Sequence, residues 1–321
     1  MTPVQRAEHL VSTGKVPEAL ACLRMAGSSG DAHALFVEAL WLLGGDYVPR
    51  DLPKARTLLN QAIAIGHVDA ALMDIALTAN GSGGATDWQA ATDRLAVAAK
   101  TDTVARQHLQ ILSAMRLDAR GYPTRTLRYT ELCAGPRILR YANLVSLAER
   151  RHIVSNVGMM MQPSVVVDPR TGRQTPNPIR TSDGALIGPP REDLVIAAIN
   201  RRLAAASGTE LRQGEALAIL RYAPGQQYRD HLDALPGVRN QRVTTMIVYL
   251  NDGYRGGETI FPKLNIKVVP KAGDALLFDN VVDGKVDQRS LHAGLPVEVG
   301  TKWIATRWIR RDPFDPWQGT E

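Results

Sequence analysis

The chain has 321 residues, of which 45% are hydrophobic and 22% charged, a composition that excludes extensive disorder and predicts a folded protein of two domains. It contains no stretch of about 18 apolar residues, so we predict no membrane-spanning helix. The first residues, MTPVQRAEHL, lack the basic and then apolar layout of a secretory signal, and Cys22 and Cys133 are too few for a disulfide framework. We therefore expect a cytoplasmic protein.

The net charge of +6 is distributed unevenly along the chain. Residues 1–115 contain nine Lys and Arg against eleven Asp and Glu, whereas the remainder carries a balance of +8. The basic residues of this second part are dispersed arginines and form no run with interleaved aromatic residues. This pattern suits an acidic partner or a small anionic ligand, and we do not predict binding to nucleic acid.

The first hundred residues contain a sequence repeat with a period of 36 residues. In each copy, Ala, Leu and Ala occupy positions i, i+4 and i+7, which places the three side chains on one face of a helix. The copies are Ala19, Leu23 and Ala26, then Ala55, Leu59 and Ala62, then Ala91, Leu95 and Ala98. A period of this length predicts helix–turn–helix repeats stacked as a short solenoid.

The second copy also carries the wider pattern Asp51, Lys54, Ala55, Ala62, Gly66 and Ala70. This pattern resembles the tetratricopeptide-like repeats of the Sel class over about residues 4–110, and it weakens in the third copy, where Gln89 stands in place of proline. The resemblance implies a surface for a peptide or protein partner. A helical cap that only stabilises the second domain is the alternative. We assign residues 1–112 to this helical repeat domain and residues 113–136, interrupted by Gly and Pro, to a linker.

The second half of the chain changes to short β-prone runs separated by Gly and Pro. These runs are ALAILRY, VTTMIVYL, ETIF, IKVVP, ALLF, LPVEV and WIATRWI. Before them, residues 192–206 (EDLVIAAINRRLAAA) are predicted to form a helix that packs across a sheet. Several short strands with frequent turns predict an antiparallel sandwich or barrel.

A candidate metal site lies within these strands. His231 and Asp233 are separated by one residue, so in a strand both side chains point to the same side. After 58 further residues comes His292, which would arrive from another strand. Two histidines and one carboxylate form a facial triad that leaves coordination positions open, as a ferrous oxygenase centre requires.

Two further residues suit a dicarboxylate co-substrate. Lys302 follows His292 by ten residues, and a buried cation beside an iron site needs an anion such as the distal carboxylate of 2-oxoglutarate. Tyr222 precedes His231 by nine residues, and its hydroxyl could donate to the same carboxylate. The alternative interpretations are a solvated lysine at a strand edge and an aromatic residue of the core.

Several ordered stretches resemble the prolyl 4-hydroxylase family of 2-oxoglutarate- and Fe(II)-dependent dioxygenases. They are LRYAPGQQYRDHLD (220–233), TTMIVYLNDGYRGGETIFP (244–262), PKAGDALLFDN (270–280) and SLHAGLPVEVGTKWIATRWI (290–309), with VVDPRTGRQTPNPIRTSDGALI (166–187) upstream. The similarity covers about residues 137–312. It implies a double-stranded β-helix, or jelly roll, with flanking helices over residues 137–315, and hence an α+β multidomain chain.

The resemblance also implies roles for individual residues. It gives His231, Asp233 and His292 as iron ligands, Lys302 and Tyr222 as contacts of 2-oxoglutarate, and Tyr228, Trp308 and Arg180 as substrate-side residues. No catalytic side chain is expected beyond the metal centre. The implied cofactors are Fe(II), 2-oxoglutarate and O2, with L-ascorbate as reductant.

The implied reaction hydroxylates an unactivated C–H bond and releases succinate and CO2. We favour a prolyl residue of a peptide or protein as substrate, since the repeats offer a surface for a polypeptide. A free amino acid or a biosynthetic small molecule is the alternative, and an inactive β-domain on a repeat-protein scaffold is a third interpretation. Asp233 is followed by Ala-Leu-Pro-Gly instead of the aromatic pair of collagen-type relatives, so the substrate is not specified by this loop.

Overall fold

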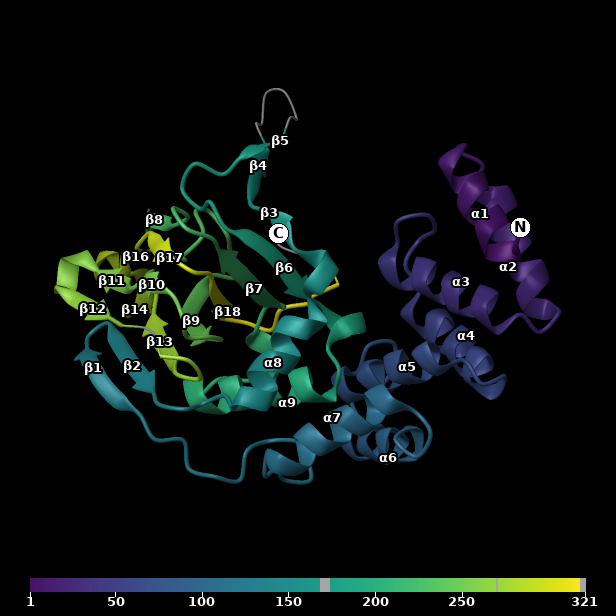
Figure 1. Ribbon diagram of the computed structural model, residues 1–321, viewed down its shortest axis with the longest axis horizontal. Coiled ribbons are helices and arrows are strands. Elements are labelled where there is room, and N and C mark those ends of the chain that lie inside the picture. The colour runs from purple at the N-terminus through teal and green to yellow at the C-terminus, as the bar shows by residue number, and fades with distance from the viewer. Residues whose placement is uncertain (168–173, 270, 318–321) are drawn as a thin grey trace. The chain divides into compact units, whose positions relative to one another are not determined.

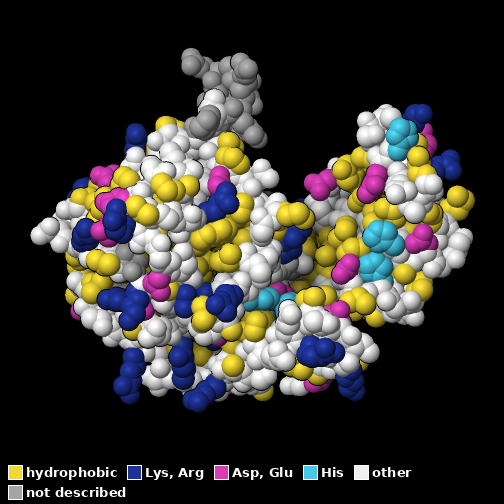
Figure 2. Space-filling model, in the orientation of Figure 1, with side chains coloured by type: hydrophobic (Ala, Val, Ile, Leu, Met, Phe, Trp, Pro, Cys, Tyr) yellow, Lys and Arg dark blue, Asp and Glu magenta, His cyan; other side chains and the backbone are white. Residues whose placement is uncertain are grey.

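The computed structural model describes residues 1–167, 174–269 and 271–317. The chain forms two units, which we call the helical unit (residues 1–121 with 189–197) and the β unit (residues 122–188 with 198–321). Residues 168–173 of the upstream family-like stretch, and Pro270 of a later one, lie outside the described residues. Most Lys and Arg side chains visible in Figure 2 lie on the β unit, in keeping with the uneven charge of the sequence.

Seven helices in antiparallel succession build residues 1–114 of the helical unit (Figure 1). They are α1 (Pro3–Ser12), α2 (Val16–Ser28), α3 (Ala32–Gly44), α4 (Leu52–Ala64), α5 (Val68–Asn80), α6 (Trp88–Ala98) and α7 (Thr103–Ala114). The repeated Ala and Leu residues lie on α2, α4 and α6, where all are buried except the half-buried Ala26 and Ala98. Small side chains at these positions let the next helix approach closely, so the repeat with a period of 36 residues produces the stack.

Aspartates mark the start of most of these helices. Asp31, Asp51, Asp87 and Asp102 each accept a hydrogen bond from a backbone N–H of the first turn of α3, α4, α6 and α7. Such caps satisfy N–H groups that have no partner within the helix. At α5 the same position is taken by His67, whose Nδ1 accepts from the N–H of Ala70.

The β unit contains two larger antiparallel sheets (Figure 1). The eight-stranded sheet has the order β1 (Thr130–Ala134), β2 (Arg137–Tyr141), β13 (Ala275–Asp279), β9 (Arg242–Tyr249), β18 (Lys302–Arg310), β7 (Leu217–Tyr222), β6 (Asp183–Ile187) and β3 (Gln162–Pro163). The four-stranded sheet has the order β12 (Ile266–Val268), β11 (Thr259–Phe261), β16 (His292–Gly294) and β8 (Tyr228–His231). The remaining described strands form the pairs β4 (Val165–Val167) with β5 (Gln174–Pro176), β10 (Arg255–Gly256) with β17 (Val297–Val299), and β14 (Val281–Val282) with β15 (Lys285–Val286).

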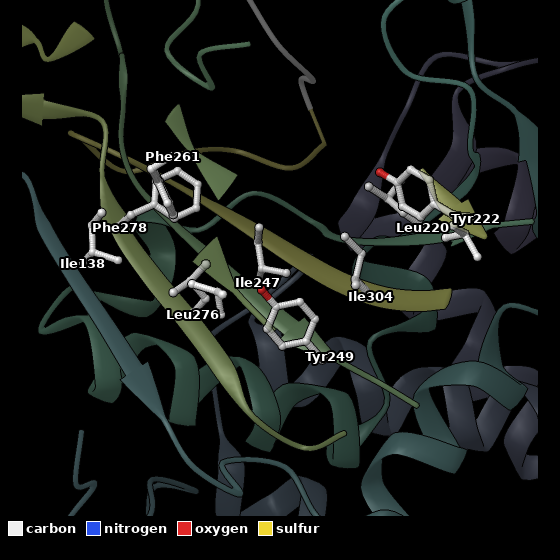
Figure 3. Packing of buried hydrophobic residues seen from close by; sticks show 11 residues of the cluster. Ile138, Leu220, Tyr222, Ile247, Tyr249, Phe261, Leu276, Phe278 and Ile304 are labelled. Carbon is white, nitrogen blue, oxygen red and sulfur yellow. The ribbon is translucent and has the colours of Figure 1, made fainter. Parts of the chain in front are cut away.

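The core of the β unit joins the two sheets. Leu220, Ile247 and Ile304 of the large sheet belong to the same buried cluster as Phe261 of the small sheet (Figure 3). Val268 of the small sheet belongs to this cluster as well. Alternate residues of each strand face this core, as expected for strands with a period of two. The sandwich confirms the expected jelly roll, and the helical repeats confirm the expected α+β class.

Two helices pack along the large sheet (Figure 1). The helix expected over residues 192–206 is α9 (Leu194–Ser207), and α8 (Leu147–Asn156) lies beside it. Arg202 of α9 donates two hydrogen bonds, of 2.7 and 2.9 Å, to the carboxylate of Glu149 on α8. Both residues are buried, so this bidentate pair fixes the two helices against each other.

The segment 113–136 differs from the expected linker. It includes β1, which pairs with β2 and extends the large sheet, and the boundary between the two units falls at residues 121 and 122. Gly121, Pro123, Gly135 and Pro136 suggested a break, yet the residues between these breakers form an edge strand. In the described part of the chain, no helix combines the length and the apolar character needed to cross a membrane.

Candidate active site

The pairing of two strands of the small sheet brings the metal-ligand candidates together. His231 ends β8, His292 begins β16, and the two residues are direct cross-strand partners. Asp233 follows two residues after His231, and its carboxylate oxygens lie 3.6 Å from Nε2 of His231 and 3.7 Å from Nε2 of His292. The three ligand atoms all lie within 4.8 Å of one another. This cluster could hold one metal ion.

Hydrogen bonds orient all three side chains. Nδ1 of His231 lies 2.7 Å from the carbonyl oxygen of Arg229, and Nδ1 of His292 lies 3.0 Å from that of Ser290. A carbonyl oxygen can only accept, so each Nδ1 carries the proton and each Nε2 presents a lone pair to the cluster. The histidines are therefore in the tautomer that binds a metal through Nε2.

The carboxylate of Asp233 is supported from behind. Its Oδ2 accepts a hydrogen bond of 2.7 Å from the hydroxyl of Thr245 on β9. The hydroxyl of Thr245 in turn accepts one of 2.9 Å from Nδ2 of Asn280. All three residues are buried, so the carboxylate is held in a fixed orientation. No local sequence pattern links Thr245 or Asn280 to Asp233, so neither residue can be predicted from the sequence alone.

The charge states of the cluster suit a divalent cation. Burial alone would raise the pKa of Asp233, but the neighbouring imidazoles and the hydrogen bond from Thr245 outweigh it and hold that pKa below its usual range. Burial lowers the pKa of His292 to about 4, against the opposing field of Asp233. At neutral pH the site therefore offers an ionised carboxylate and a neutral imidazole, which are the forms that bind metal. Two nitrogen donors and one oxygen donor fit ferrous iron.

Lys302 lies at the start of β18 and is only 3% exposed, which excludes a solvated lysine at a strand edge. Its Nζ donates a hydrogen bond of 2.6 Å to the carbonyl oxygen of Gly257. No carboxylate of the described residues lies within ion-pair distance of this ammonium. Burial lowers the pKa of Lys302 to about 8, although the field of Glu258 opposes the shift. A buried cation in this state favours an anionic ligand.

Gly257 is required where it lies. Its φ of +69° is in the left-handed region, and a Cβ atom there would be 3.0 Å from Cδ of Lys302. A side chain at this position would press on Lys302 and strain the backbone.

Lys302 and the metal-ligand cluster line one cavity, whose remaining walls are apolar or carry hydroxyl groups. Leu220, Ile247 and Ile304 supply apolar surface, and the first of these lies beside Tyr222 in Figure 3. Tyr222 is buried, and burial raises the pKa of its hydroxyl well above the usual value, so it stays a hydrogen-bond donor. Such surroundings suit a small dicarboxylate with an apolar middle.

Two of the three substrate-side candidates also line this cavity. The ring of Tyr228 stacks on that of His231, with centroids 3.4 Å apart, and burial raises the pKa of Tyr228 to about 12. Trp308 is buried, and its Nε1 has no hydrogen-bond partner among the described residues. Arg180 does not line the cavity, but its guanidinium lies 5.6 Å from the ring centroid of Tyr228.

An ion pair between Arg242 and Glu215 packs against the indole ring of Trp308. The guanidinium of Arg242 lies 4.0 Å above the indole ring and donates two hydrogen bonds, of 2.6 and 2.8 Å, to Glu215. This arrangement combines a cation–π contact with a bidentate pair, which fixes the plane of the indole. Arg242 takes the first position of β9.

Comparison with known proteins agrees with this geometry. Residues 217–310 match the family model described as the 2OG-Fe(II) oxygenase superfamily. Over 196 residues the chain is 37% identical to prolyl 4-hydroxylase 1 of Arabidopsis thaliana, covering 55% of this chain and 69% of the relative.

Two solved structures are similar to parts of the chain. The viral collagen prolyl hydroxylase of Paramecium Bursaria Chlorella virus-1, in complex with 2OG, is 29% identical with a TM-score of 0.44, and the match covers 56% of this chain and 98% of that one. A Sel1 repeat protein from Oxalobacter formigenes is 24% identical with a TM-score of 0.30, covering 34% of this chain and 85% of that one. The extent of identity with the plant enzyme and the match to the oxygenase model show that the chain belongs to the prolyl 4-hydroxylase family of 2-oxoglutarate- and Fe(II)-dependent dioxygenases.

Proposed function

We propose that this dioxygenase hydroxylates a prolyl residue within a peptide or protein and converts 2-oxoglutarate to succinate and CO2. The observation that carries the proposal is one cavity lined at once by His231, Asp233 and His292 and by the buried ammonium of Lys302. The similarity to prolyl 4-hydroxylase 1 of Arabidopsis thaliana supports the choice of proline.

His231, Asp233 and His292 would hold the iron, which when bound supplies the activation of O2 and the oxidation of the C–H bond. The contribution of this chain is placement. Thr245 keeps the carboxylate in position, and the carbonyl oxygen of Ser290 keeps Nε2 of His292 unprotonated. A ligand set oriented in advance needs little reorganisation during the reaction.

Lys302 and Tyr222 would bind the distal carboxylate of 2-oxoglutarate. The ammonium has hydrogen-bonding capacity beyond its bond to Gly257, and the hydroxyl of Tyr222 remains protonated at every pH of interest. The buried setting excludes water from the anion, so its charge-assisted hydrogen bonds are stronger than at a surface. L-ascorbate would restore iron that is oxidised in unproductive turnovers.

The substrate side favours a polypeptide over a free amino acid. Tyr228 lies between the cavity and an open surface groove of about 530 Å³, which is also lined by Ile179, Arg229, Asp230 and Leu295. A free amino acid would leave this groove empty, whereas an extended peptide could place its proline beside Tyr228 and its neighbours along the groove. Trp308 and Arg180 would complete the substrate side.

The test is succinate release with Fe(II) and 2-oxoglutarate, comparing proline-containing peptides with free proline and related acids. We expect turnover with peptides and a mass gain of one oxygen atom on the peptide. Turnover only with the free acids would favour the small-molecule alternative. Absence of both iron binding and turnover would favour a repeat-protein scaffold with an inactive β unit.

A further inference from the structure

The helical unit has an open groove between its first and second repeats. The groove has a volume of about 580 Å³, and its apolar lining includes Leu20 on α2, Leu42 on α3, Leu52 on α4 and Val48 of the connecting loop. Leu20 is only half buried, so apolar surface is accessible inside it.

The equivalent place in the second repeat is filled by a polar network. One period of 36 residues after Leu20 stands Arg56, whose guanidinium donates to Asp74 (2.7 Å), to the hydroxyl of Thr78 (2.7 Å) and to the carbonyl oxygen of Ser82 (3.1 Å). Arg94 of α6 forms a second ion pair with Asp74. These side chains cover the surface between α4 and α5.

The first repeat replaces three side chains of this network. Leu20 stands for Arg56, Leu42 for Thr78 and Glu38 for Asp74, each 36 residues earlier. Glu38 is buried and pairs only with Arg24, at 3.0 Å, within the described residues. Because leucines replace the arginine and the threonine, the first repeat lacks the hydrogen bond that Arg56 makes with Thr78 in the second.

The charged groups at the groove are mostly cations. Arg24, Arg50 and Lys54 line it, together with the single carboxylate of Asp51. That carboxylate already accepts a hydrogen bond of 3.0 Å from the backbone N–H of Lys54 as the cap of α4. Arg24 has a side chain that is 52% exposed even though it pairs with Glu38. The groove thus combines an apolar floor with a positively charged rim.

We propose that this groove docks a segment of a partner polypeptide in which apolar side chains alternate with carboxylates. The apolar side chains would bury the surface of Leu20 and Leu52, and the carboxylates would pair with Arg24 and Lys54. The docking goes beyond hydroxylation and does not rest on the identity of the hydroxylated residue, because the groove lies wholly within the helical unit.

The test measures binding of the full-length chain to two arrays of short synthetic peptides. In one array Leu, Val, Phe or Pro residues alternate with Glu, and in the other Lys replaces Glu. We expect the acidic peptides to bind at least about tenfold more tightly than the basic ones, with the difference shrinking at high salt. Absence of binding, or equal binding of both arrays, would overturn the proposal.

Two variants locate the binding. Leu20→Arg recreates the arginine of the second repeat, with Glu38 as its acceptor. The new side chain should fill the groove and lower the affinity for acidic peptides at least about tenfold. Gln61→Arg adds the same charge at an exposed position of α4 that does not line the groove, and should leave affinity unchanged. Equal affinity of the Leu20→Arg chain and the natural chain would disprove the site.

A third variant keeps the test valid if Leu20→Arg fails to fold. Lys54→Glu places a carboxylate in the first turn of α4, which favours the helix, while reversing one charge of the rim. This variant should bind the acidic peptides more weakly and the basic peptides more tightly than the natural chain does. Unchanged preference in this variant would contradict the charge assignment. Turnover of 2-oxoglutarate with a short proline peptide should stay the same in all three variants, because none of these residues lies in the β unit.

Discussion

Lys302 on β18 and Tyr222 on β7 are direct cross-strand partners, and Nζ of Lys302 lies 5.5 Å from the centroid of the Tyr222 ring. From Lys302, alternate residues of β18 face the cavity as far as Trp308. Six residues of extended strand span roughly 20 Å. One strand thus carries the candidate co-substrate contact at its start and a candidate substrate contact near its end.

Replacing Lys302 should weaken the binding of 2-oxoglutarate and leave the binding of iron unchanged. In the Lys302→Met variant we expect the KM for 2-oxoglutarate to rise by about 10- to 100-fold, because a charge-assisted hydrogen bond contributes about 1.5–3 kcal/mol. Iron affinity should stay the same, since Lys302 is not part of the ligand cluster. The control is Lys267→Met, which removes an exposed lysine paired with Glu258. An equal KM in both variants would remove the proposed role.

The buried Lys302 should also give the folding stability a characteristic pH dependence. Its pKa is about 8 in the folded chain, against 10.5 for an ordinary lysine. Below pH 8 it is charged in both states, so the folded state bears the full cost of burying the charge. Above that pH the unfolded chain binds more protons, so the contribution of Lys302 to the unfolding free energy rises by up to roughly 1.4 kcal/mol per pH unit.

Lys302→Met removes this contribution. Without 2-oxoglutarate, the variant should therefore be more stable than the natural chain at pH 7, and the difference should shrink towards pH 10. Urea unfolding at several pH values measures it. A difference that does not change with pH would mean that the lysine is not buried as a cation.

The hydrogen bond from Thr245 should tune metal affinity. Thr245→Val leaves Asp233 in place but removes its donor, and we expect metal affinity to fall by about 10- to 100-fold. The neighbouring Thr244 donates to Asp279 instead, so Thr244→Val is a matched control that should bind metal normally. Titration with Mn(II), which needs no turnover, separates the two. His231→Ala should abolish both metal binding and hydroxylation while the fold persists.

We expect Trp308 to bind the peptide substrate through a hydrogen bond from its indole N–H. Trp308→Phe keeps an aromatic wall and removes the buried donor Nε1, so the KM for the peptide should rise by about 3- to 10-fold, the effect of one hydrogen bond. The KM for 2-oxoglutarate should not change. Trp303 is an odd-numbered residue of β18 that does not line the cavity, so Trp303→Phe is the control. Unchanged peptide kinetics in Trp308→Phe would make this residue part of the core.

The folding stability of the helical unit should depend on Asp74. Asp74 is 2% exposed and pairs with both Arg56 and Arg94, so Asp74→Asn would leave two guanidinium groups without their carboxylate. We expect a loss of about 2–4 kcal/mol in the unfolding free energy, reduced from the fully buried case because Arg94 is half exposed. Asp93→Asn at the surface should change stability by less than about 0.5 kcal/mol. Urea unfolding, followed by the circular dichroism of the helices, measures both free energies. Equal unfolding free energies of the two variants would contradict the role of the network.

Local patterns account for the parts of the fold that could be predicted. The triplets that begin at Ala19, Ala55 and Ala91 recur on α2, α4 and α6, because a helix repeats its buried face at a fixed spacing. The boundary between the units was less predictable. Gly and Pro residues near β1 suggested a linker, whereas pairing with the distant β2 and β13 of the sheet makes the segment part of the β unit.

Sequence alone determined the fold class and the candidate ligands, because the spacing of His231 and Asp233 and the resemblance of the surrounding stretches are read directly along the chain. Tertiary structure alone decided what supports them. The bond from Thr245 to Asp233 and the packing of Arg242 on Trp308 join separate strands, and their contact depends on strand register, which a short sequence window does not contain. The groove beside Leu20 also depends on tertiary structure, because its lining comes from different helices and their connecting loop, which only the packing of the repeats brings together.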